Sequence, residues 1–215
     1  GALVHNQKSG VSQFMAATEE EGLQMIRDLI SYLPQNNLEE PPLKPTNDPI
    51  DRKEDALNQI IPDKPNKPYD MQQIIHAIVD DAEFLEVHKD FAKNLIVGFA
   101  HFNGMPVGVV ANNPSFFAGV LDINASRKGA RFVRFCDAFN IPVLTLTNVN
   151  GFKATMCSER NIAAAAAKLT YAFGNATVPK VNVITGKAFG NAYNVMNSKA
   201  IGCDMVYAWQ KAEIG

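Results

Sequence analysis

The spacing of apolar residues along the chain changes near residue 94. Before that point, the most regular pattern follows a capping box, in which Thr18 is the N-cap and Glu21 reaches back to the chain. Apolar residues then recur at helical spacing until Pro34, and this spacing predicts a helix with one buried face. The residues of that face are Leu23, Ile26, Leu29, Ile30 and Leu33.

A proline-rich stretch follows over residues 34–68, with Asn, Asp, Lys and Glu between the prolines. Because proline fixes φ and lacks an N–H group, we expect mostly extended chain here, interrupted by a helical turn near residues 55–61. We interpret this stretch as an interdomain linker that is held on the protein surface. Its prolines are Pro34, Pro41, Pro42, Pro45, Pro49, Pro62, Pro65 and Pro68.

Strands and helices alternate in the rest of the chain. A short amphipathic helix is predicted at residues 70–80. Two strands are joined by Asn103-Gly104, a dipeptide that favours a tight hairpin because both residues tolerate positive φ. The predicted elements are strands at 94–102 and 105–112, a helix at 125–140, a strand at 142–149, a helix at 159–175, a strand from 181, a helix near 191 and a strand at 205–209.

This order predicts an α/β fold with a largely parallel sheet, right-handed crossovers and helices packed outside. Ligands of such sheets bind beyond the carboxyl ends of the strands. Two predicted loops occupy that edge of the sheet, residues 148–152 after one strand and residues 186–194 after the next. The sequence therefore places a candidate site between these two loops.

Composition and charge exclude several classes of protein. The chain has 215 residues, a hydrophobic fraction of 47% and a formal net charge of −2. Because no basic cluster with interleaved aromatic residues is evident, nucleic-acid binding is not expected. We find no bilayer-length apolar run and no signal peptide. Three widely spaced cysteines (Cys136, Cys157 and Cys203) fit reduced cytoplasmic thiols, and no His, Cys or Asp cluster has metal-ligand spacing.

Residues 180–198 carry the most informative local pattern. A β-branched strand ends at a glycine turn, and the chain restarts as a helix near Asn191. At such a junction the first helical amides lack intrahelical partners and point outward with the positive end of the helix dipole. Gly190 allows the sharp turn, and the small Ala192 allows close approach of a ligand. This geometry suits an oxyanion, although an ordinary strand–turn–helix unit uses the same residues.

Several longer motifs resemble one protein family. The chain is similar to the carboxyltransferase subunit of biotin-dependent acyl-CoA carboxylases, of the propionyl-CoA and acetyl-CoA carboxylase kind. The resemblance runs from end to end. The matching segments include residues 1–5, 33–37, 68–71, 97–112, 118–122, 130–142, 176–180 and 187–190, and the last of these reads Lys187-Ala-Phe-Gly190.

The resemblance implies a crotonase-like fold built from spirals of ββα units, in two halves. In this family, the N-terminal half of the subunit binds acyl-CoA and the C-terminal half binds carboxybiotin. The active site lies between the N-terminal half of one subunit and the C-terminal half of another. By that map, residues 1–40 are the tail of the N-terminal half, residues 41–70 are the linker and residues 71–215 are most of the C-terminal, biotin-side half. We therefore expect a fragment of a longer enzyme.

The resemblance also assigns candidate site residues. The backbone amides of Asn191 and Ala192, after the turn at Gly190, would donate to the ureido oxygen of biotin. Gly151 and Phe152 would line the pocket. Asn194 would help to choose the acyl substrate, because many members of the family have Asp there. No side-chain acid or base and no metal is required.

The implied partners and alternatives follow from the same likeness. Biotin would be carried on a biotin carboxyl carrier or biotin carboxylase subunit, and we expect a dimer-based homo-oligomer, hexameric in the family, in the cytoplasm. Asn148-Val-Asn-Gly-Phe152 and Asn191 depart from the family pattern. These departures resemble a divergent branch, the carboxyltransferase subunit of sodium-pumping acyl-CoA decarboxylases, which would have a membrane partner. A non-catalytic assembly module is a third reading.

Overall fold

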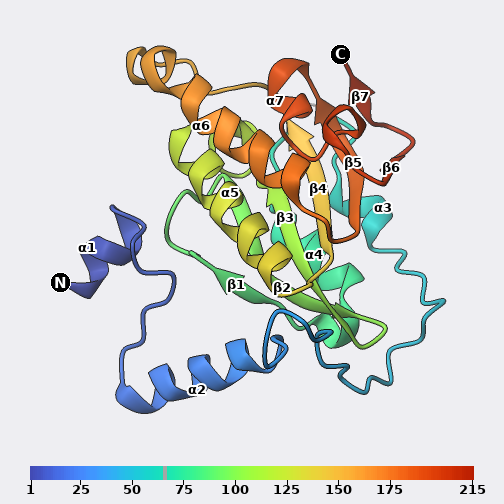
Figure 1. Cartoon of the computed structure of the whole chain (residues 1–215). Helices are drawn as coiled ribbons and strands as arrows, with labels where there is room; N and C mark the ends of the chain where they lie inside the picture. The colour runs from blue at the N-terminus through green and yellow to red at the C-terminus, as the bar shows by residue number, and fades with distance from the viewer. Residues whose placement is uncertain (65–66) are drawn as a thin grey trace.

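The computed structural model describes residues 1–64 and 67–215. Its central element is a mixed β-sheet (Figure 1). Its strands lie in the order β1-β2-β3-β4-β5-β6, and β7 pairs with β5. The β1–β2 and β2–β3 pairs are antiparallel, and every later pair is parallel. The strands are β1 (Leu85–Val87), β2 (Leu95–Phe102), β3 (Met105–Asn112), β4 (Val143–Val149), β5 (Lys180–Ala188), β6 (Met205–Ala208) and β7 (Glu213–Ile214).

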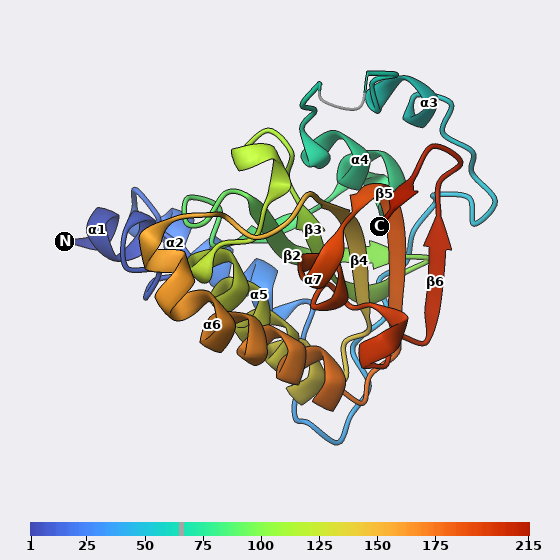
Figure 2. The same ribbon diagram turned by 90° about the horizontal axis from the view of Figure 1, so that it is seen from above.

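Helices cover both faces of this sheet. In Figure 2, α5 and α6 lie against one face and α4 lies against the other. Residues of β2 alternate between the two faces: Leu95 and Val97 join the core beneath α5 and α6, and Ile96 joins the core beneath α4. The helices are α1 (Ala2–Gln7), α2 (Glu19–Ile30), α3 (Leu57–Ile60), α4 (Met71–Ile78), α5 (Ile123–Ala138), α6 (Met156–Asn175) and α7 (Gly190–Asn194).

Local sequence signals place most of these elements. Asn103 and Gly104 form the predicted hairpin turn with φ of 50° and 78°, and the carboxylate of Asp80 accepts hydrogen bonds from both amides. Thr18 caps α2 as expected. Thr155 caps α6, which begins at Met156, earlier than predicted, because the Thr155 hydroxyl accepts from the amide of Ser158 at 3.1 Å.

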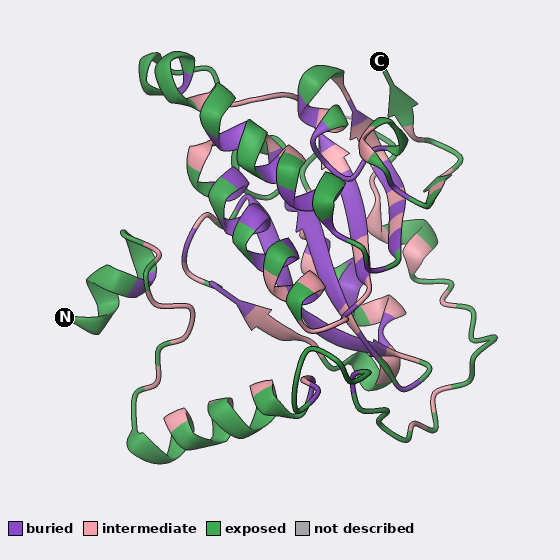
Figure 3. Ribbon diagram, viewed as in Figure 1, coloured by how far each residue is buried: buried purple, intermediate pink, exposed green. Residues whose placement is uncertain are grey.

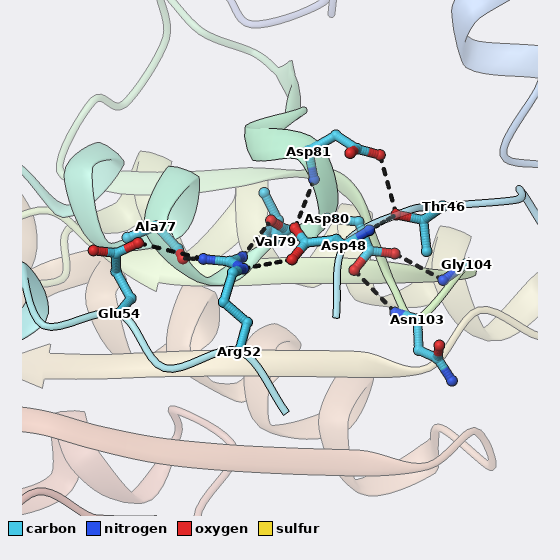
Figure 4. Close-up of polar contacts among 10 residues, drawn as sticks. All are labelled: Thr46, Asp48, Arg52, Glu54, Ala77, Val79, Asp80, Asp81, Asn103 and Gly104. Atoms are coloured by element: carbon cyan, nitrogen blue, oxygen red, sulfur yellow. Dashed lines mark hydrogen bonds and ion pairs between the residues drawn. The ribbon is translucent and has the colours of Figure 1, made fainter. Parts of the chain in front are cut away.

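The proline-rich stretch is fastened to the surface, as predicted. Arg52 pairs with Asp48 and donates to the carbonyls of Ala77 (2.8 Å) and Val79 (3.2 Å), as Figure 4 shows. Asp48 also accepts from the amide of Asp81 at 3.0 Å. The helical turn appears as α3. Pro65 lies outside the described residues, and the role of the stretch as an interdomain linker stays a prediction.

The predicted buried face of α2 is wrong for this chain. No residue of α2 is buried, and Leu23, Ile26 and Ile30 are 54%, 54% and 59% exposed (Figure 3). Only Leu29 and Leu33, near its C-terminal end, pack against the core. The amphipathic pattern correctly indicated an apolar face, but that face is not covered by the described residues of the chain.

The sheet differs from the prediction at β1, β5 and β7. β5 does not end at its glycine but continues through Gly186 to Ala188, and the turn falls at Phe189 and Gly190. The short edge strand β1 and the two-residue β7 were not predicted, because neither is long enough to show an alternating pattern. The remaining strands and the order of elements after residue 94 match the prediction.

Gly108 lies where α5 packs most closely on the sheet. A Cβ atom there would lie 2.5 Å from Cys136 Sγ and 3.1 Å from the Phe132 ring, both in the buried core. We predict that Gly108→Ala lowers the free energy of unfolding by about 1–3 kcal/mol through overpacking. Gly174→Ala, in the open last turn of α6, is the control and should raise it by up to about 1 kcal/mol. Chemical denaturation measures both, and equal effects would contradict the prediction.

Asp48 makes attachment of the proline-rich stretch pH-dependent. The hydrogen bond from Arg52, followed by that from the Asp81 amide, lowers the pKa of Asp48 below its ordinary value. Its contribution to stability is therefore present above the ordinary carboxyl pKa and is lost as pH falls through the lowered one. We predict that Arg52→Gln raises the Asp48 pKa in an NMR titration and speeds proteolysis between residues 45 and 55. The neighbouring Lys53→Gln should change neither, and an unchanged Asp48 pKa in Arg52→Gln would refute this account.

Candidate functional site

Asn148 joins the carboxyl ends of β4 and β5. Its side-chain Oδ1 accepts from the amide of Lys187 at 2.9 Å, and its Nδ2 donates to the hydroxyl of Tyr69 at 2.8 Å. Its own amide donates to Asn112 Oδ1 at 3.1 Å. The β4–β5 register shifts between Thr147 and Val149, so Asn148 bonds across the place where the ladder is irregular. Both loops predicted to form the site are thereby held together.

Tyr69 extends this connection to the end of the proline-rich stretch. Its hydroxyl lies 3.3 Å from Thr185 Oγ1 and accepts from Asn148. Burial raises the pKa of Tyr69 above its ordinary value, and the two hydrogen bonds partly oppose that rise. The phenol is therefore neutral at physiological pH. A hollow of about 220 Å³ lies here, lined by residues that include Tyr69, Asn148, Gly186 and Lys187.

The loop after β4 holds Gly151 and Phe152 against a neighbouring segment. The carbonyl of Gly151 accepts from the amide of Leu121 at 3.0 Å, and the amide of Lys153 donates to the Leu121 carbonyl at 2.7 Å. Gly151 has a φ of 137°, a conformation that favours glycine. Phe152 is partly buried against the main core. This loop is therefore fixed by backbone hydrogen bonds on both sides of Phe152.

The helix α7 begins as the sequence predicted. Gly190 has a φ of 57°, and its amide donates to the carbonyl of Gly215 at 2.7 Å. The amide of Tyr193 donates to the Phe189 carbonyl. Between them, the amides of Asn191 and Ala192 find no hydrogen-bond acceptor among the described residues. Two adjacent donors at the start of the helix thus have no acceptor in the part of the chain that the structure describes.

The small side chain of Ala192 faces the protein core, whereas the sequence analysis expected it to leave room for a ligand. The residue is 1% exposed and its methyl group packs into the main core, so the side chain faces the protein rather than a ligand. Asn191, by contrast, is exposed. A buried amide without an acceptor is rare in proteins because it costs free energy. The unpartnered amide of Ala192 is therefore the more unusual of the two.

Buried asparagines support α7 from behind. Asn182, on β5, donates to the carbonyls of Met196 (3.2 Å) and Asn197 (3.1 Å), just after α7. Asn197 Nδ2 in turn donates to Thr145 Oγ1 at 3.1 Å on β4. All three polar side chains are essentially unexposed. These bonds fix the segment after α7 on the two strands whose ends form the site.

The structure brings most of the predicted site residues together. The amide of Phe189 donates to the carbonyl of Val149 at 3.2 Å, so the segments leading to Gly151 and Gly190 lie side by side. Asn194 is exposed at the end of α7, and its carbonyl accepts from Ser198. The sequence analysis placed Asn148 in a site loop and Tyr69 in a matching segment, but it gave neither side chain a role. A polar residue at the end of an apolar strand was the available signal for Asn148.

Residues 1–64 and 67–215 contain no group of three or more His, Cys, Asp or Glu that could hold a metal ion. Cys136, Cys157 and Cys203 are free thiols. Of the described helices, none has both the length and the apolar composition needed to cross a membrane.

Comparison with known proteins assigns the family. The chain matches the carboxyl transferase domain over residues 1–215, and it belongs to this family. It is 52% identical to the propionyl-CoA carboxylase carboxyltransferase subunit of Haloferax mediterranei and 47% identical to methylmalonyl-CoA decarboxylase subunit alpha of Veillonella parvula. In each case the match covers 100% of this chain and 42% of the relative, so the chain spans less than half the length of these enzymes.

Solved structures agree with the sequence comparison. The transcarboxylase 12S hexamer structure with methylmalonyl-CoA superposes with a TM-score of 0.97 at 42% identity, over 100% of this chain and 42% of the other. A single-chain long-chain acyl-CoA carboxylase, at 23% identity and a TM-score of 0.85, shares the fold. The predicted α/β crotonase-like carboxyltransferase fold and the predicted family are confirmed.

Asn148 allows a direct test of how the two loops are held. We predict that Asn148→Ala lowers the free energy of unfolding by about 1–3 kcal/mol, because the Lys187 amide loses its acceptor and Tyr69 loses its donor. Tyr69→Phe removes only the phenolic contacts and should cost about 1 kcal/mol. In the double variant the effects should be less than additive. Denaturant unfolding of all three proteins gives the coupling, and full additivity would show that the contact is not formed.

Proposed function

We propose that this chain forms the biotin side of a carboxyltransferase site, which transfers a carboxyl group between carboxybiotin and a short-chain acyl-CoA such as propionyl-CoA or acetyl-CoA. The observation that carries the proposal is the pair of adjacent amides, Asn191 and Ala192, at the start of α7, which have no acceptor among the described residues. The family membership supports the reaction class. The ureido oxygen of biotin suits this pair of donors, because a urea oxygen is a strong acceptor for two N–H groups.

Carboxybiotin supplies the carboxyl group, and its ureido oxygen gains negative charge as that group leaves. The amides of Asn191 and Ala192 would donate to this oxygen with their positions fixed in advance. One donor of this kind is commonly worth roughly 3 kcal/mol, or about two orders of magnitude in rate. Gly190, with its φ of 57°, turns the chain just before the two donors, and Gly151 and Phe152 would form the neighbouring wall. No acid or base from the chain is needed for this role.

The remaining expectations belong to the same proposal. Residues 1–40 would end an N-terminal half that binds acyl-CoA, residues 41–70 would be the linker, and residues 71–215 would be the biotin-side domain. Biotin would arrive on a carrier or biotin carboxylase subunit. A homo-oligomer in the cytoplasm would complete the site between subunits. The likeness to a hexameric transcarboxylase structure supports the oligomer, and Asn194 remains the proposed determinant of acyl preference.

The Veillonella parvula relative, named as a methylmalonyl-CoA decarboxylase subunit, supports a second candidate. In that reading the same donors would take part in carboxyl transfer from acyl-CoA to biotin, in a complex with a membrane partner. The two candidates use one site in opposite directions. The neighbouring genes separate them, since a biotin carboxylase gene favours carboxylation and a gene for a multi-span membrane protein favours decarboxylation.

The amide pair can be tested by removing one donor without removing a side-chain contact. We predict that Asn191→Pro weakens binding of biocytin about threefold to tenfold, because proline has no N–H group and is tolerated in the first turn of a helix. Asn191→Ala keeps the amide and should bind like the original chain. In ¹H–¹⁵N NMR spectra, the amide signals of residues 191 and 192 should move on biocytin addition.

Thermal unfolding of both variants checks that the fold is kept. Equal binding by Asn191→Pro and Asn191→Ala, with unmoved amide signals, would reject the role of the pair. It would favour the third reading, a non-catalytic assembly module.

A further inference from the structure

A row of arginines lies on one face of α5, away from the amide pair. Arg127, Arg131 and Arg134 are exposed and follow the spacing i, i+4 and i+7, so their side chains lie along the same face over about 10 Å. Lys168, exposed on α6, faces the same hollow. We call this surface, defined by these four cations, the basic groove. The expectation that the chain has no basic cluster is therefore wrong.

The basic groove is a concave surface rather than a flat charged face. It surrounds a hollow of about 920 Å³ between α5, α6 and the loop that contains Gly10. The helices α5 and α6 pack side by side in Figures 1 and 2. Aromatic rings line the same hollow, namely those of Phe91, Phe135 and Tyr171. Tyr171 is 65% exposed, so its ring is available for stacking.

The cations of the basic groove lack carboxylate partners among residues 1–64 and 67–215. None of the four forms a salt bridge there, and no Asp or Glu lines the hollow. Nearby acids are occupied elsewhere, because Glu86 accepts from Gln72 and Asp90 pairs with Lys93. A protein with a net charge of −2 thus concentrates unneutralised positive charge in one hollow.

Two neighbouring contacts hold the basic groove in shape. With the Gln13 amide assigned in the orientation that satisfies both its oxygen and its nitrogen, the oxygen accepts from Nε and Nη2 of Arg131 at 3.1 and 3.2 Å. This contact orients the guanidinium without neutralising it. Lys128, 2% exposed beneath the groove, donates to the carbonyls of His88 (3.0 Å) and Phe91 (2.7 Å). Burial lowers the pKa of Lys128 to about 7, so this residue serves as a structural hydrogen-bond donor beneath the groove. The exposed arginines and Lys168 carry the positive charge.

We propose that the basic groove binds a nucleotide, with its phosphate groups on the arginines and Lys168 and its planar base against the aromatic rings. Guanidinium groups pair with phosphate oxygens in two-pronged hydrogen bonds. A row of about 10 Å matches a cluster of two or three phosphates, and a single hollow of this length is too short for the repeated backbone of a nucleic acid. Two sources share this chemistry, namely the nucleotide end of a CoA ester and a free nucleoside triphosphate.

The test titrates the 215-residue chain with CoA, ATP and inorganic pyrophosphate, using calorimetry at low and moderate salt. We expect CoA or ATP to bind at least tenfold more tightly than pyrophosphate, because only nucleotides carry a base, and to weaken as salt rises. Tighter binding of CoA identifies the CoA ester as the source, and this would deepen the proposed function. Tighter binding of ATP identifies a free nucleotide.

Matched variants locate the binding. The double variant Arg127→Gln/Arg134→Gln should weaken nucleotide binding at least tenfold. Arg160→Gln, which removes an exposed arginine of α6 outside the hollow, should stay within twofold. Tyr171→Ala should weaken nucleotides but not pyrophosphate. Thermal unfolding confirms that each variant is folded.

Three results would overturn the inference: equal affinity for pyrophosphate and both nucleotides, an unchanged double variant, or tighter binding of polyglutamate or single-stranded DNA. Biocytin binding measured on the same samples keeps the two proposals separate. Loss of nucleotide binding with biocytin retained would count only against the basic groove, and the reverse would count only against the amide pair.

Discussion

The side-chain amide of Asn148 is the contact on which the candidate site depends. Its oxygen accepts from the Lys187 amide and its NH2 group donates to the Tyr69 hydroxyl, so both ends of the side-chain amide are used. Gly186 is needed opposite it, because a Cβ there would lie 2.8 Å from the Asn148 side chain. The ladder between β4 and β5 can therefore be irregular at this point without separating the two loops that follow it.

The hydrogen bonds around α7 differ between the segment behind the helix and its first turn. Behind the helix, Asn182 and Asn197 place their amide groups against strand and loop carbonyls. At its first turn, the amides of Asn191 and Ala192 have no acceptor within residues 1–64 and 67–215. The hydrogen bonds of Asn182 and Asn197 behind α7 are buried. Rotating α7 to bring its two first-turn amides to an acceptor would therefore break several of them. The hydrogen bonds behind α7 thus keep the two donors in place, as the proposed oxyanion role requires.

The sequence predicted those parts of the fold that short-range patterns determine. Asn103-Gly104 sets the hairpin, and Thr18 starts its helix, because each acts within a few residues. The start of α7 followed from a strand, a glycine and the first helical amides in succession. The exposed face of α2 could not be predicted, since an amphipathic pattern reports only that one side is apolar and says nothing about what covers it. Edge strands as short as β1 carry too few residues to alternate visibly.

The site residues that could not be predicted from the sequence are those that meet through contacts between distant parts of the chain. Asn148 and Tyr69 lie 79 positions apart, and no local spacing joins a loop tyrosine to the end of a strand. The arginines of α5 were overlooked for a related reason. In the printed sequence, Arg127, Arg131 and Arg134 are separated by five buried residues, of which only Lys128 is charged, so no long run of positive charge is visible. Once the helix winds, the same spacing stacks them along one face, and α6 adds Lys168 from a distant part of the chain. Net charge and charge runs therefore describe the local surface of a helical protein poorly, and charge has to be counted along each exposed face.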